Sequence, residues 1–275
     1  PSRFTGGRRR ATRCPLARRR HSATPPRSWP RRASIDALEE PLVTTPKPSS
    51  RGNALLGQLP RAFGDRFLSQ CDEVELTVDE RLVFAGRRHP QVHFPQTGLI
   101  GVLAEVRGHE ALEVAVIGSE GVDGAMLALR GSASSTCSVV LVGGRAWRIG
   151  VPRFRAELDA SAGLRRLIEA AVTHLFAQVA QAVPCTRFHS VPSRLALWLL
   201  RAQDRVGASE LRFTHLRLAG LLGVQRSAVT LAAGHLHRAG IIRYARGTLR
   251  ILDRDRLEAA ACPCYAIGRR SRAAS

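Results

Sequence analysis

The feature that most constrains the fold is the run from Thr214 to Ala239, where two short helical patterns meet at a glycine. The hydroxyl of Thr214 can accept a hydrogen bond from an amide of the first turn, as helix N-caps do. Gly223 ends the first pattern and suits the left-handed conformation that is common just after a helix. The apolar faces of the two patterns consist of Leu218, Leu221 and Leu222, and of Val229, Ala232, Ala233 and Leu236. Two short helices joined by a tight, glycine-containing turn form a helix-turn-helix.

The second helix of this pair carries polar side chains at and near its start. They are Gln225, Arg226, Ser227 and Thr230. Such side chains can form hydrogen bonds with base edges or with phosphates. We therefore predict that these residues, together with Thr214, belong to a DNA-binding site.

A basic hairpin follows the helix pair. Residues 241–244 and 249–252 read as strands around a turn at 245–248, and Arg243, Arg246 and Arg250 lie on or beside the hairpin. An ordinary helical hairpin and β-hairpin inside a core is the alternative. The combination with three arginines favours a winged helix whose hairpin contacts DNA.

The N-terminal half has the period-two pattern of short strands. We expect a short helix over 53–70 and then strands at 74–78, 82–85, 92–94, 99–106, 111–117, 137–142 and 146–149. Residues 107–110 should join two of the strands as a hairpin. Many short strands with turns at this spacing indicate a sandwich or a barrel.

A long helix should connect the two halves. Pro152 suits its first turn, and a heptad-like stripe follows with Leu164, Ile168, Ala171 and Leu175. The stripe suits pairing with a second copy of the same helix, although packing against the barrel fits the periodicity equally well. Pro184 should end or kink this helix, and another amphipathic helix should span 191–205.

Charge is concentrated in the first part of the chain. The 275 residues carry a net charge of +20, and residues 1–51 hold half of it, with thirteen Arg and Lys against three acidic residues. A segment so rich in Arg, Pro, Ser and Thr cannot bury enough apolar surface to fold, so we expect a disordered basic tail over 1–52. An organellar transit peptide has a similar composition, and the arginine runs could also touch nucleic acid nonspecifically.

Composition argues against several other classes of protein. No stretch approaches the ~20 apolar residues of a membrane helix, so we expect a cytoplasmic protein with no membrane partner. The six cysteines are scattered along the chain. Only one residue separates Cys262 from Cys264, which is too few for the usual zinc knuckle. We therefore expect free thiols, no metal and no cofactor. His89, His93 and His109 lack a nucleophile or acid at a diagnostic spacing, which favours loop or surface histidines over an enzyme.

The order of these parts resembles the Crp–Fnr family of bacterial transcription regulators, from about Asn53 to Tyr265. The most telling segments are His-Phe-Pro-Gln-Thr-Gly at 93–98, Glu-Val-Ala-Val-Ile-Gly-Ser-Glu-Gly at 113–121, and Leu-Gly-Val-Gln-Arg-Ser-Ala-Val-Thr at 222–230. The resemblance implies a jelly-roll-like barrel as sensor, homodimers formed through the long helix, and a recognition helix in the major groove.

The sequence departs from two branches of that family. Cyclic-AMP-responsive members place an Arg-Glu pair early in the recognition helix and a second Arg four positions after the Glu. Arg226 matches the first Arg, but Ser227 stands in place of the Glu and Leu231 in place of the second Arg. No Arg occurs in 132–137 to pair with a cyclic phosphate, so we predict that the barrel does not bind cyclic AMP. Cys14 is alone in its region, which argues against the iron–sulfur chemistry of the oxygen-sensing members.

We therefore expect an α+β protein that regulates transcription as a homodimer on a palindromic operator in double-stranded DNA. RNA polymerase and an unknown small-molecule effector are the further expected partners. The expected domains are a basic tail (1–52), a sensor barrel (53–150), a dimerisation helix (151–186), a winged helix (187–265) and a short tail (266–275). The alternative is a ligand-binding sensor whose main role is not promoter binding.

Overall fold

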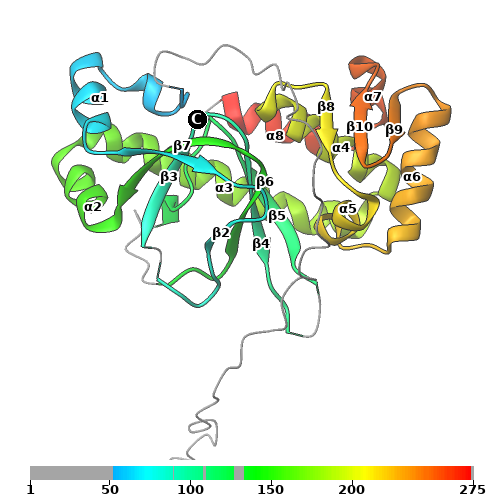
Figure 1. Ribbon diagram of the computed structural model, residues 1–275, viewed down its shortest axis with the longest axis horizontal. Helices are drawn as coiled ribbons and strands as arrows, with labels where there is room; N and C mark the ends of the chain where they lie inside the picture. Colours follow the sequence, from blue (N-terminus) through cyan, green and yellow to red (C-terminus); the bar gives the residue numbers. More distant parts are fainter. Residues whose placement is uncertain (1–51, 89, 108–109, 127–132, 274–275) are drawn as a thin grey trace, which may run out of the picture. The chain divides into compact units, whose positions relative to one another are not determined.

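The computed structural model describes residues 52–88, 90–107, 110–126 and 133–273 (Figure 1). The expected basic tail, apart from Gly52, therefore lies outside the described residues, as do His89 and His109. In the part of the chain that the structure describes, no helix combines the length and the apolar content needed to cross a membrane.

The first half of the described chain is mainly β-structure. Its elements are η1 (a 3-10 helix, Leu56–Gln58), α1 (Arg61–Leu68), β1 (Asp72–Leu76), β2 (Arg81–Val83), β3 (Gln91–Pro95), β4 (Leu99–Ala104), β5 (Leu112–Ile117), β6 (Cys137–Val142) and β7 (Gly144–Gly150). The helix expected over 53–70 is thus two short pieces, separated where Pro60 precedes α1 in an extended conformation.

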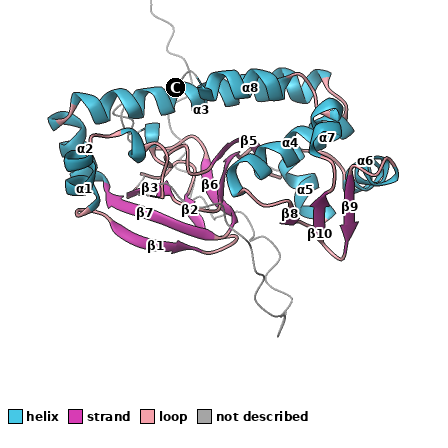
Figure 2. Ribbon diagram, turned by 90° about the horizontal axis from the view of Figure 1, so that it is seen from above, coloured by secondary structure: helices cyan, strands magenta, loops and turns pink. Residues whose placement is uncertain are grey.

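The second half is mainly helical. Its elements are α2 (Val151–Ala160), α3 (Ala162–Phe188), α4 (Val191–Val206), β8 (Glu210–Arg212), α5 (His215–Leu222), α6 (Arg226–Arg238), β9 (Ile242–Ala245), β10 (Thr248–Ile251), α7 (Arg254–Ala260) and α8 (Cys264–Ala273). The expected tail over 266–275 is therefore wrong for its described part, since α8 continues to residue 273 and packs against α3 (Figure 2).

Two antiparallel sheets form the N-terminal domain, with strand orders β1-β7-β3 and β2-β6-β4-β5. Apolar side chains from both sheets share one core, which confirms the predicted jelly-roll-like arrangement; its members are Leu76, Ile100, Val102, Ala115, Ile117, Val140 and Ala146. The hairpin predicted around 107–110 is confirmed by the pairing of β4 with β5. The chain passes from one sheet to the other at Gly143-Gly144, where a Cβ on Gly144 would lie only 2.5 Å from the backbone of Thr97.

The long connecting helix is divided at Ser161. The Ser161 side chain accepts a hydrogen bond from the amide of Leu164, at 3.2 Å, and so caps α3 at its N-terminus. The helix then continues past Pro184 to Phe188, so of the two effects predicted for Pro184, an end or a kink, the end is wrong.

The predicted dimer stripe on α3 needs correction. Leu164 and Ile168 are both 0% exposed, because they pack in the chain's own core together with Phe94 and Phe154. They are therefore not available to a second copy. Ala171 and Leu175 are partly buried against the N-terminal domain. The large apolar side chains that α3 exposes are instead Phe176, at 70%, Val183, at 71%, and Phe188, at 74%, in its last turn.

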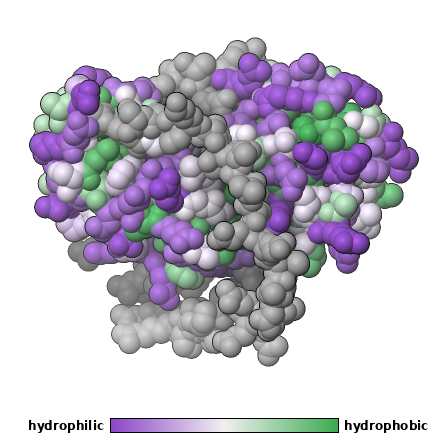
Figure 3. Space-filling view, turned by 45° about the horizontal axis from the view of Figure 1, so that its top comes forward, coloured by the Kyte–Doolittle hydropathy of each residue, from purple (hydrophilic) through white to green (hydrophobic). Residues whose placement is uncertain are grey.

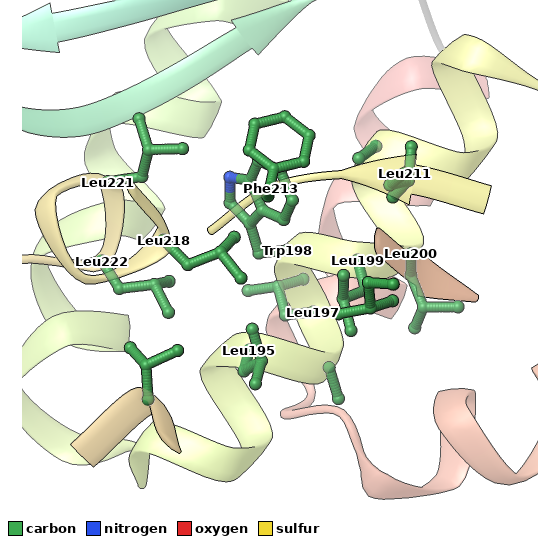
Figure 4. Close-up of a cluster of buried hydrophobic side chains, with 14 of the residues drawn as sticks. Leu195, Leu197, Trp198, Leu199, Leu200, Leu211, Phe213, Leu218, Leu221 and Leu222 are labelled. Atoms are coloured by element: carbon green, nitrogen blue, oxygen red, sulfur yellow. The ribbon is translucent and has the colours of Figure 1, made fainter. Parts of the chain in front are cut away.

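The C-terminal domain is built around α4. Its leucines and Trp198 form the centre of a core that also receives side chains from α5, α6 and the three-stranded sheet β8-β10-β9 (Figure 4). Trp198 meets Phe213 edge to face, with ring centroids 4.7 Å apart. This core fixes the position of α5 and α6 relative to the hairpin.

Candidate nucleic-acid interface

The turn between α5 and α6 has the local geometry expected from the sequence. Thr214 Oγ1 accepts a hydrogen bond from the amide of Arg217 at 3.1 Å, which confirms its role as the N-cap of α5. Gly223 follows α5 in the left-handed conformation, with φ at 62°, as predicted. Gln225 then precedes α6 in an extended conformation, and the recognition helix begins at Arg226.

The start of α6 is open to solvent. Gln225, Arg226 and Ser227 are all exposed, whereas Val229 and Leu236 on the opposite face are buried in the core. The first amides of a helix lack partners within the helix, and its N-terminus carries a partial positive charge. This end of α6 can therefore present side chains, amides and positive potential to a polyanion.

Thr230 is exposed one turn further along α6, but its hydroxyl already has partners. It donates to the carbonyl of Arg226 at 3.0 Å and lies 3.0 Å from Nδ1 of His215. Since its single proton goes to the carbonyl, the imidazole is the donor in the second contact. The His215 ring also stacks on Tyr244, with centroids 4.1 Å apart.

His215 thus connects α5, α6 and β9, a role that sequence reasoning missed. Burial and the charge of Arg226 lower the pKa of His215, which favours the neutral ring. The only local signal in the sequence is its place directly after the helix cap. The contact leaves Thr230 less free to read bases than predicted.

The hairpin brings the three predicted arginines together. Arg243 and Arg250 lie directly opposite each other on β9 and β10, and both are exposed. Arg246 and Gly247 form the two-residue turn, with φ values of 48° and 81°. Two positive φ values define a type I′ turn, which suits Asn or Gly and is unfavourable for Arg. The turn places Arg246 at the exposed tip of the wing, and strand β9 of the wing contacts α6 (Figure 1).

The segment from the start of α6 to the end of the wing carries a net positive charge. The residues from 226 to 250 include five arginines and no acidic residue, and residues 187–265 contain thirteen arginines against five acidic residues. On the face that Figure 3 shows, hydrophilic residues predominate and apolar residues form separate patches. An arginine-rich surface around a helix N-terminus is suited to DNA phosphates.

His93 is a buried strand residue, so its interpretation as a loop or surface histidine is wrong. Its Nδ1 lies 3.6 Å from Oδ2 of Asp123, and Ser138 Oγ donates to the other oxygen of that carboxylate at 2.7 Å. The serine bonds the carboxylate rather than the imidazole, so the group lacks the order of a hydrolytic triad.

The N-terminal domain and α3 enclose a small cleft of about 80 Å³. Its lining includes Val116, Glu120 and Gly121 on one side and His174 and Gln178 of α3 on the other. Gln178 bridges the two sides, accepting from the amide of Val116 at 3.3 Å and donating to its carbonyl at 3.2 Å. Among the described residues that line the cleft there is no arginine or lysine.

The cysteines are less scattered than the sequence suggested. Cys185, Cys262 and Cys264 are buried together beside His189, and their sulfur and nitrogen atoms all lie within 4.8 Å of one another. Sequence spacing could not reveal this group, because 77 residues separate Cys185 from Cys262.

The fold and this interface define a winged-helix DNA-binding protein with a β-sandwich domain at its N-terminal side. Residues 193–260 match the family described as Crp-like helix-turn-helix domain. No curated protein sequence matches the chain significantly. Residues 193–260 therefore form a Crp-like helix-turn-helix domain, and the chain is a DNA-binding transcription regulator.

Several solved structures share the fold over most of this chain. FixK2 from Bradyrhizobium japonicum is 14% identical, with 70% of this chain and 98% of that chain covered and a TM-score of 0.59. The c-di-GMP-responsive global regulator CLP of Xanthomonas campestris is 16% identical, with 70% and 99% covered and a TM-score of 0.58. A CRP/FNR-family transcriptional regulator from Thermus thermophilus, TTHA1359, is 20% identical, with 69% and 98% covered and a TM-score of 0.57.

Proposed function

We propose that the protein regulates transcription as a homodimer that reads a palindromic operator with α6 in the major groove. The observation that carries this proposal is the exposed start of α6 together with a hairpin that bears three exposed arginines. Arg226 is central to it, because a guanidinium can bond a guanine through two donors at once. Gln225 and Ser227 supply further hydrogen-bonding groups next to it.

The wing has a different role in this proposal. Arg243, Arg246 and Arg250 contact phosphates along the backbone, and they contribute affinity for any sequence. Thr214 contributes to DNA binding indirectly, since its hydroxyl caps α5 and so stabilises the helix-turn-helix. Thr230 and His215 hold α6 against the wing, so they position the contacts more than they make them.

A second copy covers the exposed side of α3. Phe176 and Val183 are exposed and seven residues apart, and Val172 and Val179, which are partly buried against the N-terminal domain, border them at spacings of four and three. Such a pattern pairs helices in a coiled coil. The proposed dimer seam is therefore the stripe Val172, Phe176, Val179 and Val183, and it replaces the one that begins at Leu164.

The signal is a molecule other than cyclic AMP. The cleft beside α3 is small, and its described lining includes Glu120 but no arginine or lysine for a cyclic phosphate. RNA polymerase is the further partner that we propose for a regulator of this kind. The competing function is a sensor whose main role is not promoter binding.

The test is a gel-shift titration of the full chain on the upstream promoter DNA, at several salt concentrations and against a scrambled duplex. The proposal expects tighter binding to the promoter, and a linear fall of log K with log salt. Equal affinity for both duplexes would instead support the sensor alternative.

A further inference from the structure

Four metal-binding side chains meet at the end of α3. Cys185 lies in its last turn, and His189 follows four residues later as its C-cap. Cys262 lies between α7 and α8, and Cys264, after Pro263, is the first residue of α8. We propose that Cys185, His189, Cys262 and Cys264 bind one Zn²⁺ ion as a structural site.

The distances suit a single tetrahedral ion. Cys185 Sγ lies 3.7 Å from Cys262 Sγ, and Cys264 Sγ lies 3.4 Å from His189 Nδ1. Donors at zinc distances of about 2.3 Å for sulfur and about 2.0 Å for nitrogen are about 3.5–3.8 Å apart in a tetrahedron. An iron–sulfur cluster needs donors further apart, because several irons and sulfides lie between them.

The backbone brings the donors together for identifiable reasons. Residues four apart share one side of a helix, so Cys185 and His189 point the same way at the end of α3. The amide of Cys262 lies 3.4 Å from the carbonyl of Ser193 at the start of α4, which holds the other two cysteines against this corner. The short spacing of Cys262 and Cys264 is therefore compatible with metal binding, since the other two ligands come from the end of α3, far away in the sequence.

Residues next to the four ligands supply a hydrogen-bond donor and a positive charge, which stabilise metal-bound thiolates. Gln181 Nε2 donates to Cys264 Sγ at 3.1 Å, and such donors orient and stabilise metal-bound thiolates. Three thiolates and a neutral imidazole around Zn²⁺ carry a net charge of −1. Arg201 lines the same hollow as Cys185 and Gln181, so its guanidinium can balance that charge.

A site with four protein ligands has no open position for a substrate, so its role is structural. The ion would connect α8 to the corner between α3 and α4, where the dimerisation helix meets the DNA-binding domain. Binding releases the thiol protons, and the stabilisation it gives counts directly toward folding.

The experiment measures metal in the purified full chain, after expression with zinc and extensive desalting. We expect about one zinc per chain, and a near-complete loss in Cys264→Ser. Replacing zinc by Co²⁺ should give the thiolate-to-cobalt charge-transfer band of a tetrahedral site. Cys71→Ser is the matched control, because Cys71 lies in the N-terminal domain away from the cluster; its metal content should stay unchanged.

His189 provides a second variant that does not depend on losing a thiol. His189→Cys should keep the metal with four sulfur ligands, whereas His189→Ala should bind Co²⁺ at least about tenfold more weakly. A metal-free wild type that also fails to take up Zn²⁺ or Co²⁺ when reduced would overturn the proposal. So would equal metal content in the wild type and in Cys264→Ser, or a Cys185–Cys262 disulfide in the native chain. These readouts need no DNA, so they are independent of the proposed function.

Discussion

Glu113 shows how one residue can make the fold sensitive to pH. Its carboxylate projects from β5 toward α4, and both oxygens receive the indole N–H of Trp198, at 3.0 and 2.9 Å. Burial raises its pKa to about 7, although the indole and the charges of Arg201 and Arg205 act in the opposite direction. In the folded protein the proton is therefore held to higher pH than in the unfolded chain.

The consequence is a loss of stability as pH rises. Between pH 4.5, the usual pKa of such a carboxyl, and about 7, the unfolded chain releases this proton while the folded chain keeps it. The free energy of unfolding should therefore fall across that window. Urea unfolding of Glu113→Gln should show a smaller fall, while Glu169→Gln, at an exposed position on α3, keeps the wild-type dependence. Equal dependence in all three proteins would contradict this reasoning.

Arg226 is the residue on which specific recognition should depend. Arg226→Ala should weaken binding to the operator by about 1–3 kcal/mol and relax discrimination at one base pair. The measurement is a titration of operator and random duplexes with each variant. Arg238→Ala, at the other end of the same helix, is the control and should change operator binding less. An equal loss on both duplexes would show that Arg226 contacts phosphate instead of a base.

Single residues also show where sequence reasoning succeeds. The cap at Thr214 and the left-handed Gly223 were predictable, because both depend on local backbone chemistry. Leu164 and Ile168 were misassigned because periodicity tells which side of a helix is apolar but not what covers it. The group around Cys185 was not predictable, since only the folded chain brings its members together.

Among the elements, the wing has a conformational cost that can be tested. Arg246 stands at a positive φ in a turn that favours Asn-Gly. Arg246→Asn should therefore keep or raise the melting temperature while it removes one phosphate contact. The slope of log K against log salt should fall by about 0.9.

The control for the wing is a charge change elsewhere. Arg61 is exposed on α1 in the N-terminal domain, so Arg61→Gln should leave the salt slope as it is. If Arg246→Asn also leaves the slope unchanged, the tip of the wing does not contact DNA.

The strands illustrate what element-level reasoning can reach. Alternation located most of them within a few residues, and the hairpin β4-β5 followed from its turn. The passage from β6 to β7 could not be predicted as a change of sheet, because the pairing partners of β7 are the distant strands β1 and β3. Likewise β8 adds a third strand to the wing from before the helix-turn-helix.

At the scale of the whole molecule, polar contacts link the DNA-binding domain to the sandwich. Arg205 Nε lies 2.6 Å from Oε1 of Glu120, and Arg217 Nη2 lies 2.8 Å from Oδ1 of Asp79. Glu120 also lines the cleft beside α3. A molecule bound in that cleft would therefore act on a residue that contacts the DNA-binding domain, which gives an effector a direct physical route to α4.

The dimer is the prediction on which the whole arrangement depends. Phe176 is 70% exposed, so Phe176→Glu should leave the monomer folded while it puts a charge into the proposed seam. Sedimentation should then give monomers, and operator binding should be lost, because one chain can occupy only one half-site.

For the wild type, the half-sites should be palindromic and about one helical turn, roughly 34 Å, apart. Met126→Glu, at an exposed apolar residue of the N-terminal domain, is the control and should remain dimeric. A wild type that sediments as a monomer at micromolar concentration with full operator affinity would refute the dimer. A Phe176→Glu protein that stays dimeric would place the seam on another surface, since a buried glutamate pair in the centre of a coiled coil carries an uncompensated charge that the interface could not tolerate.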